Sequence, residues 1–151
     1  MNTPSYPLPA RSFARPAAVA AAILFGGLSA FEIALAAGVP WGAAAFGGAS
    51  AVLEPALRVA AGISAVVWAA AALIVLRRAG HPVWAPLPRR ALPVAVWVLA
   101  GYTALGVLMN SISPSPIERA IWVPATIAMS ALCFGIAIAL RRRRTAAASE
   151  R

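Results

Sequence analysis

Four long apolar stretches limit what this chain can fold into. They are predicted at residues 16–37, 55–76, 92–109 and 116–140. Each is close to the roughly 20 residues that a helix needs to cross the hydrocarbon layer of a membrane. Alanine dominates them, and strict apolar–polar alternation is absent, which argues against membrane-spanning β-strands. The sequence therefore predicts an all-α fold, a four-helix transmembrane bundle with antiparallel neighbours and short loops.

Composition supports a membrane environment and excludes several classes of site. Hydrophobic residues make up 62% of the chain and charged residues 11%, whereas soluble domains average about 45–50% and about 25%. The single cysteine, Cys133, lies within an apolar stretch and allows no disulfide within the chain. The sequence has no phosphate-binding loop, dinucleotide-binding fingerprint or zinc motif. We therefore expect no metal, no cofactor and no nucleic-acid partner.

The arginines predict how the spans are oriented. All 13 basic residues are arginine, and eleven of them fall in the N-terminal tail, the loop between the second and third spans, and the C-terminal tail. Only Arg58 and Arg119 fall on the other side. Because arginine-rich loops stay in the cytoplasm, we expect a multi-pass protein of the bacterial cell (inner) membrane with N- and C-termini cytoplasmic. Residues 1–15 would form a flexible cytoplasmic tail, 16–140 the transmembrane domain and 141–151 a basic cytoplasmic tail.

Two further patterns predict partners. The arginines at 141–144 directly follow the fourth span, so we expect anionic lipids near Arg141, Arg142, Arg143 and Arg144. Small residues recur every four positions and would let helices approach closely, which leaves open a homo-oligomer or a membrane partner. These predicted contact faces are Ala18, Ala22, Gly26 and Ala30; Ala61, Ala65 and Ala69; Ala100 and Ala104; and Ala131, Gly135 and Ala139.

Among the polar residues, Glu32 lies where burying a charged side chain in the membrane is expected to cost the most free energy. It lies in the last third of the first predicted span, toward the outer end, where a charged side chain is expensive and often functional. An ionised carboxylate there needs a partner. Arg58, near the outer start of the second span, is the first candidate, and Arg119 is the other. Such an ion pair would link two helices, whereas its absence beside a cavity would indicate a site.

The third and fourth spans each carry a polar face. Ser115, Pro116 and Glu118 match a capping box at the start of the fourth helix. The pattern predicts that two faces point into the bundle, one with Tyr102, Gly106 and Asn110, the other with Glu118, Trp122, Thr126 and Ser130. The predicted ligand or ion-pair cluster at the outer end is Glu32, Trp41, Arg58, Asn110, Glu118 and Arg119.

Three functional hypotheses follow from this cluster, beside a purely structural role. The first is a binding or accessory protein with an outward-facing polar site around Glu32. The second is a membrane enzyme that acts on a lipophilic substrate with Glu32 or Glu118 as acid or base, which would need two titratable groups across one cavity. The third is an oligomeric small transporter subunit, which would need polar residues at all depths. The sequence favours binding over catalysis and assigns no catalytic residue.

Two segments carry a resemblance to known sequences. They are Phe31-Glu32-x-Ala34-Leu35-x-x-Gly38-x-Pro40-Trp41-Gly42 and Asn110-x-x-Ser113-x-Ser115-x-x-Glu118-Arg119-x-x-Trp122-x-Pro124. Together they resemble small four-span bacterial integral membrane proteins, a resemblance that covers about residues 16–140. It implies the four-span layout and brings no known activity.

Overall fold

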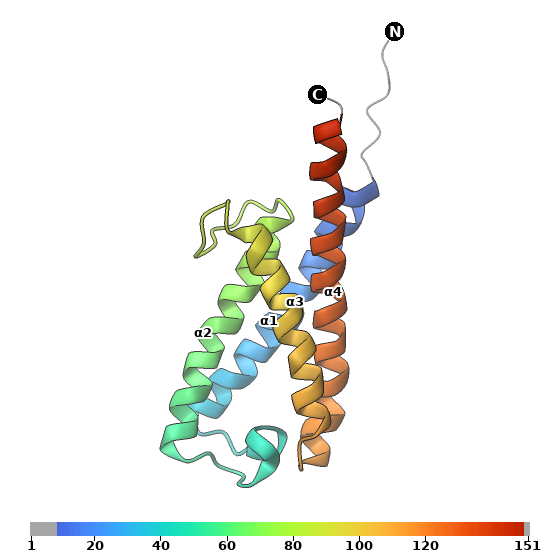
Figure 1. Ribbon diagram of the computed structural model, residues 1–151. Coiled ribbons are helices and arrows are strands. Elements are labelled where there is room, and N and C mark those ends of the chain that lie inside the picture. The colour runs from blue at the N-terminus through green and yellow to red at the C-terminus, as the bar shows by residue number, and fades with distance from the viewer. Residues whose placement is uncertain (1–8, 150–151) are drawn as a thin grey trace.

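The fold is a bundle of four helices. The computed structural model describes the backbone of residues 9–149 and the side chains of residues 13–141. The helices are α1 (Pro9–Ala37), α2 (Pro55–Arg78), α3 (Leu92–Ser111) and α4 (Pro116–Ser149), and two short 3-10 turns, η1 (Gly42–Ala44) and η2 (Phe46–Gly48), lie between α1 and α2. Each helix runs antiparallel to the one before it (Figure 1). No strand occurs in residues 9–149, so the predicted all-α class is confirmed.

Each helix contains a segment that is long and apolar enough to cross a membrane. These segments are Phe13–Ala37, Pro55–Arg78, Leu92–Ser111 and Pro116–Arg141. They carry many exposed large apolar side chains, such as Ile23, Val66 and Leu108, which are each about two thirds exposed. A soluble protein would bury such side chains, so the chain is an integral membrane protein with several spans.

The helices at the two chain ends extend beyond the predicted spans. α1 begins at Pro9 rather than near Pro16, and α4 continues to Ser149 rather than ending near Leu140. Apolar length marks only the part of a helix that lies in lipid. Alanine and arginine, which are common in both extensions, are strong helix formers in water as well.

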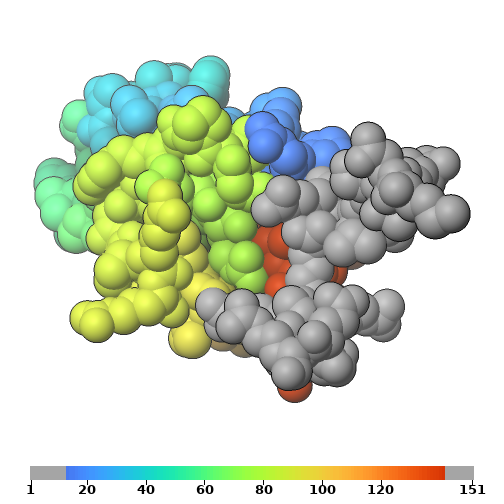
Figure 2. Space-filling model, turned by 90° about the horizontal axis from the view of Figure 1, so that it is seen from above, coloured from blue at the N-terminus to red at the C-terminus, as the bar shows by residue number. Residues whose placement is uncertain are grey.

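The two ends of the bundle differ in which segments they hold. The start of α1, the loop between α2 and α3 and the end of α4 lie together at one end, which we call the arginine-rich end (Figure 1). Figure 2 looks onto this end, where the green and yellow surface of α2, α3 and their loop lies beside the blue start of the described part of α1. The α1–α2 and α3–α4 loops lie at the opposite end, which we call the site end.

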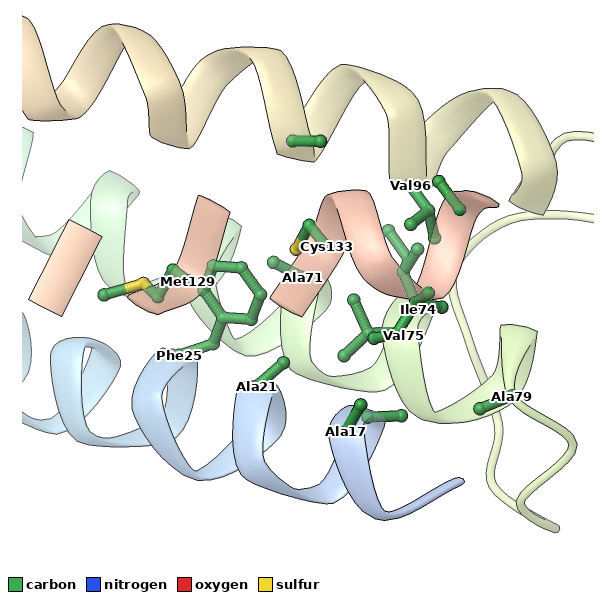
Figure 3. Packing of buried hydrophobic residues seen from close by; sticks show 14 of the residues in the cluster. Ala17, Ala21, Phe25, Ala71, Ile74, Val75, Ala79, Val96, Met129 and Cys133 are labelled. Atoms are coloured by element: carbon green, nitrogen blue, oxygen red, sulfur yellow. The ribbon is translucent and has the colours of Figure 1, made fainter. Parts of the chain in front are cut away.

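Small and medium apolar side chains fill the core near the arginine-rich end. Figure 3 shows Cys133 and Ala71 between the four helices, with Phe25 and Met129 side by side toward the site end. Cys133 is fully buried and packs as a small apolar side chain. α1 packs on α2 and α4, and α3 packs on α4, whereas the contact between α2 and α3 is much smaller. The bundle is therefore least closed between α2 and α3.

The predicted small-residue faces are only partly correct. Ala18, Ala61, Ala65 and Ala100 are buried, but Gly26, Ala30, Ala69 and Ala131 are exposed. Small residues occupy several faces of each helix, so their spacing alone does not select the buried one. On α1 the larger side chains of Phe25, Leu28 and Leu35 select it, because they are all buried and lie on one line with the buried alanines.

Candidate functional site

The site end holds a cavity of about 440 Å³. It lies where α2 and α3 stand further apart than at the arginine-rich end (Figure 1). All four helices and the α1–α2 loop contribute to its walls. The lining residues are Leu28, Phe31, Glu32, Ala44, Ala45, Phe46, Trp68, Tyr102, Thr103, Leu105, Gly106, Met109, Asn110, Glu118, Trp122 and Thr126.

Glu32 lines this cavity and carries a carboxylate oxygen without a hydrogen-bond partner among the described residues. Its Oε2 atom is buried and has no hydrogen-bond partner among the described residues. Glu32 and Phe31 occupy neighbouring positions near the end of α1, one turn beyond Leu28, so this stretch of α1 lines the cavity. A buried polar oxygen without a partner is rare in folded proteins and asks for an explanation such as a ligand or an ion.

The arginine that the sequence offers as the partner of Glu32 has another role. The Nε–H of Arg58 donates to the carbonyl of Ala36 at 2.9 Å. The guanidinium carbon and its two terminal nitrogens also lie over Gly38, whose φ of +93° ends α1. The amides of Gly38 and Val39 close the same turn by donating to Leu35 and Ala34. Arg58 therefore caps the C-terminus of α1, where carbonyl groups lack helical partners and a cation is favourable.

The second candidate partner is also used elsewhere. Arg119 is exposed and donates from a guanidinium nitrogen to the carbonyl of Ser113 in the α3–α4 loop. The predicted ion pair of Glu32 with Arg58 or Arg119 is therefore not what holds the buried Oε2 atom. Both arginines satisfy main-chain carbonyls, which cannot find water in an apolar environment.

Glu118 links the two loops of the site end. Its Oε2 atom accepts hydrogen bonds from the Gly47 amide at 2.9 Å and from the Ser113 hydroxyl at 2.5 Å. The Ser115 hydroxyl accepts from the Glu118 amide at 3.2 Å, so the Ser115 half of the predicted capping box is present. The other half is not, because the Ser115 amide donates to Ser113 instead of Glu118. The Glu118 carboxylate is thus turned toward the α1–α2 loop.

The α1–α2 loop forms the roof of the cavity and is bound to α4. The Trp122 ring nitrogen donates to the carbonyl of Ala44 at 2.7 Å, and the Ser115 hydroxyl donates to that of Ala43. Phe46, Gly47 and Gly48 all have positive φ values, 50°, 80° and 73°. A positive φ is rare for a bulky residue such as Phe46, and a side chain at Gly48 would place Cβ only 2.8 Å from that of Ser115.

Aromatic rings form much of the cavity wall. Phe31 and Trp122 meet edge to face with ring centroids 4.9 Å apart. Trp68 and Tyr102 lie 5.7 Å apart and connect α2 with α3. Trp68 also stacks on Phe25 of the core at 5.6 Å. The rings of Phe31, Trp68, Tyr102 and Trp122 thus make up much of the lining.

The cavity has its mouth beside α3. Tyr102, Leu105 and Met109 all line it, yet each is more than half exposed. They belong to a membrane-span-length helix, so the exposed side of this mouth faces lipid rather than a water-filled cleft.

Three of the six predicted cluster residues line the cavity and three do not. Glu32, Asn110 and Glu118 line it. Asn110 donates its amide to the carbonyl of Gly106 at 2.7 Å, within α3. Trp41 stacks on Phe31 at 6.0 Å from the outside and is about half exposed. The remaining two are Arg58 and Arg119, which bind main-chain carbonyls.

The predicted polar faces of α3 and α4 lie where expected, but several wall residues were missed. Tyr102, Gly106 and Asn110 line the cavity, as do Glu118, Trp122 and Thr126. Phe31, Phe46 and Trp68 also line the cavity, and the helical spacing in the sequence did not mark them as wall residues. Trp68 offered a signal, because tryptophan in a span is expected at the interface with water and this one lies near the middle of α2.

The lining can bind an organic molecule more readily than a metal ion. No group of three or more histidine, cysteine, aspartate or glutamate side chains gathers in the described part of the chain. The cavity is instead lined by two carboxylate side chains, Glu32 and Glu118, among mostly apolar and aromatic residues, the usual character of a small-molecule site. A scan against protein-family models and searches of curated proteins and solved structures find no match to this chain.

Proposed function

We propose that this protein is a membrane binding protein that takes a small lipophilic ligand into the site-end cavity through the mouth beside α3. The unpartnered Oε2 atom of Glu32 carries the proposal. Leaving such a group unsatisfied costs roughly 1–3 kcal/mol, a cost that a ligand with a hydrogen-bond donor removes. The cavity volume of about 440 Å³ lies within the range of small-molecule sites.

Two observations favour binding over the alternatives of catalysis and transport. Glu32 and Glu118 both line the cavity, as the enzyme alternative requires, but the Glu118 Oε2 atom accepts hydrogen bonds from Gly47 and Ser113, which favours a role in holding the two loops together. A transport path would need polar groups through the whole bundle. In the described side chains, the core near the arginine-rich end consists of apolar residues such as Ala17, Ala21 and Ile136.

The proposed placement in the cell follows from the arginines. Positive-inside loops put the arginine-rich end in the cytoplasm of a bacterium, with the protein in its inner membrane and both termini inside. The site end and its mouth would then lie toward the outer leaflet. Anionic lipids would gather at the other face, near the arginines at 141–144.

Photolabelling in vesicles tests the binding proposal. A long-chain alcohol and the corresponding amine, each carrying a diazirine near the head group, are activated by light, and the labelled peptides are identified by mass spectrometry. We expect label from at least one probe on cavity residues such as Phe31, Thr103 and Thr126, which are partly or fully buried. Label spread evenly over the exposed faces of all four helices would overturn the proposal.

A matched pair of variants makes the test specific to the mouth. Met109→Trp places a large ring at the mouth, whereas Leu108→Trp places the same ring on the neighbouring exposed position, which does not line the cavity. We expect Met109→Trp to reduce cavity labelling several-fold and Leu108→Trp to leave it unchanged. Equal labelling of both variants would count against entry beside α3.

A further inference from the structure

The charges around the cavity all have one sign. Its lining contains two carboxylates, Glu32 and Glu118, and no arginine, lysine or histidine. The two arginines at this end are bound to the carbonyls of Ala36 and Ser113. The two donors to Glu118 are an amide and a hydroxyl, which are neutral. The carboxyl groups of the lining therefore have no cationic partner among the lining side chains, and a bound cation would supply one.

The aromatic wall favours the same sign of charge. The face of an aromatic ring is negative, and a cation within about 6 Å of its centroid gains about 0.5–2 kcal/mol, most strongly at tryptophan. Phe31 lies next to Glu32 in the chain and packs against Trp122, so these two aromatic side chains and the Glu32 side chain line the same cavity. Trp68 and Tyr102 add two further rings on the side of the mouth.

The cation that fits is organic rather than a metal ion. Divalent metals need several oxygen or nitrogen ligands, and the described residues hold no group of three potential acidic, histidine or cysteine ligands. An ammonium group with an apolar tail matches better, because Leu105 and Met109 continue the cavity as an apolar surface toward lipid.

We propose that the ligand of this site is a cationic amphiphile, with its ammonium group beside Glu32 among the rings of Phe31 and Trp122 and its apolar tail toward the mouth beside α3. The proposal rests on the binding function proposed above and adds the charge of the ligand to it. Neutral lipids, such as long-chain alcohols, are the competing class.

Three aryl-alkyl probes of equal shape test the charge. One carries a trimethylammonium group, the second its uncharged carbon analogue, a tert-butyl group, and the third a sulfonate. Each is titrated against the full-length protein in nanodiscs of zwitterionic lipid, and the quenching of tryptophan fluorescence is corrected with empty nanodiscs. We expect the ammonium probe to bind about tenfold more tightly than its neutral analogue, which corresponds to about 1.4 kcal/mol, and the sulfonate to bind least.

Variants of two glutamates distinguish a specific effect of the Glu32 carboxylate from a general effect of negative charge at the site end. Glu32→Gln keeps the shape of the side chain and should reduce the affinity of the ammonium probe to that of the neutral one. Glu54→Gln removes a charge from an exposed residue at the same end that does not line the cavity, and it should change neither affinity. An equal loss in both variants would overturn the proposal.

A variant in the wall adds a second line of evidence in case Glu32→Gln folds poorly. Trp68→Leu keeps an apolar side chain but removes the ring face, so it should weaken the ammonium probe more than the neutral one. The neutral or the sulfonate probe could bind the unmodified protein as tightly as the ammonium probe, or more tightly, with Met109→Trp blocking that binding. Such a result would overturn the proposal that the ligand is a cation, but it would support the proposed binding function. Failure of all three probes, together with undirected photolabelling, would overturn the binding function itself.

Discussion

The two halves of this bundle are held together in different ways. Toward the arginine-rich end, small side chains such as Ala17, Ala18 and Ala21 are buried, and they let the helices pack closely in an apolar environment. Toward the site end, α1 and α2 still pack together through Leu35 and Ala61, but aromatic rings line the cavity between the helices. Side chains there also bind main-chain groups of the loops, as Trp122 binds Ala44 and Arg58 binds Ala36. Close packing in one half thus leaves the other half free to enclose a cavity.

The largest expected effect tests whether close packing stabilises the arginine-rich half. Ala18→Leu forces three extra carbons into a position that is 0% exposed. We expect the free energy of unfolding to fall by about 3 kcal/mol, because extra volume in a packed core costs about 1–3 kcal/mol and occasionally more. The measurement is unfolding by sodium dodecyl sulfate in mixed micelles. Ala20→Leu, at an exposed position of the same helix, is the control and should change little.

A smaller effect is expected from the roof of the cavity. Gly48→Ala combines a φ of +73° with a Cβ atom only 2.8 Å from that of Ser115. Gly80→Ala, in the loop at the arginine-rich end, has a φ of +90° but open space around it. The backbone cost is shared, at about 1–2 kcal/mol, and Gly48→Ala should lose about 1 kcal/mol more through crowding. The same unfolding assay compares the two variants. An equal loss in the free energy of unfolding would mean that the α1–α2 loop moves to accommodate the added methyl group without a measurable cost.

The hydrogen bonds of Glu118 should contribute less again. Glu118→Gln weakens the acceptor of the Gly47 and Ser113 hydrogen bonds. We expect a loss of about 1.5 kcal/mol in the free energy of unfolding, since hydrogen bonds to charged groups contribute about 1.5–3 kcal/mol. Amide hydrogen exchange at Gly47 should accelerate as well. A wild-type exchange rate at Gly47 would show that Glu118 does not hold the loop.

The smallest effect is expected at the residue that matters most for the proposed function. Glu32→Gln removes a carboxylate whose buried oxygen has no partner among the described residues, so no hydrogen bond is lost and the free energy of unfolding should stay unchanged or rise by about 1 kcal/mol as the unpaired charge is removed. The same assay measures it. A loss as large as that of Glu118→Gln would reveal a stabilising role for Glu32 and weaken the case for a ligand.

Much of the fold was predictable because span length and hydrophobicity are local properties of the chain. The four spans needed only the apolar runs, and the faces with Gly106 and Asn110 or with Trp122 and Thr126 needed only helical spacing. The buried face of α1 was not predictable in this way, since Gly26 and Ala30 have the same small size as Ala18 but are exposed.

The contacts of the site were less predictable because the main chain competes for the charged side chains. Arg58 was expected to bind Glu32, yet the free carbonyls at the end of α1 receive it. Glu118 was expected to complete a local capping box, yet its carboxylate binds Gly47, 71 residues away in the chain. Neither of these contacts could be predicted from residue spacing. Both depend on how the two loops of the site end pack against each other in three dimensions.

The position of Arg58 has a consequence for how the protein is assembled. Arg58 lies in the first turn of α2, but the carbonyl that it satisfies belongs to the last turn of α1. That carbonyl has no helical partner at the end of α1, and leaving a buried acceptor unsatisfied costs roughly 1–3 kcal/mol. The final turn of α1 thus becomes favourable only when the following helix has begun to form beside it. The first two spans should therefore enter the bilayer as a single hairpin rather than one after the other.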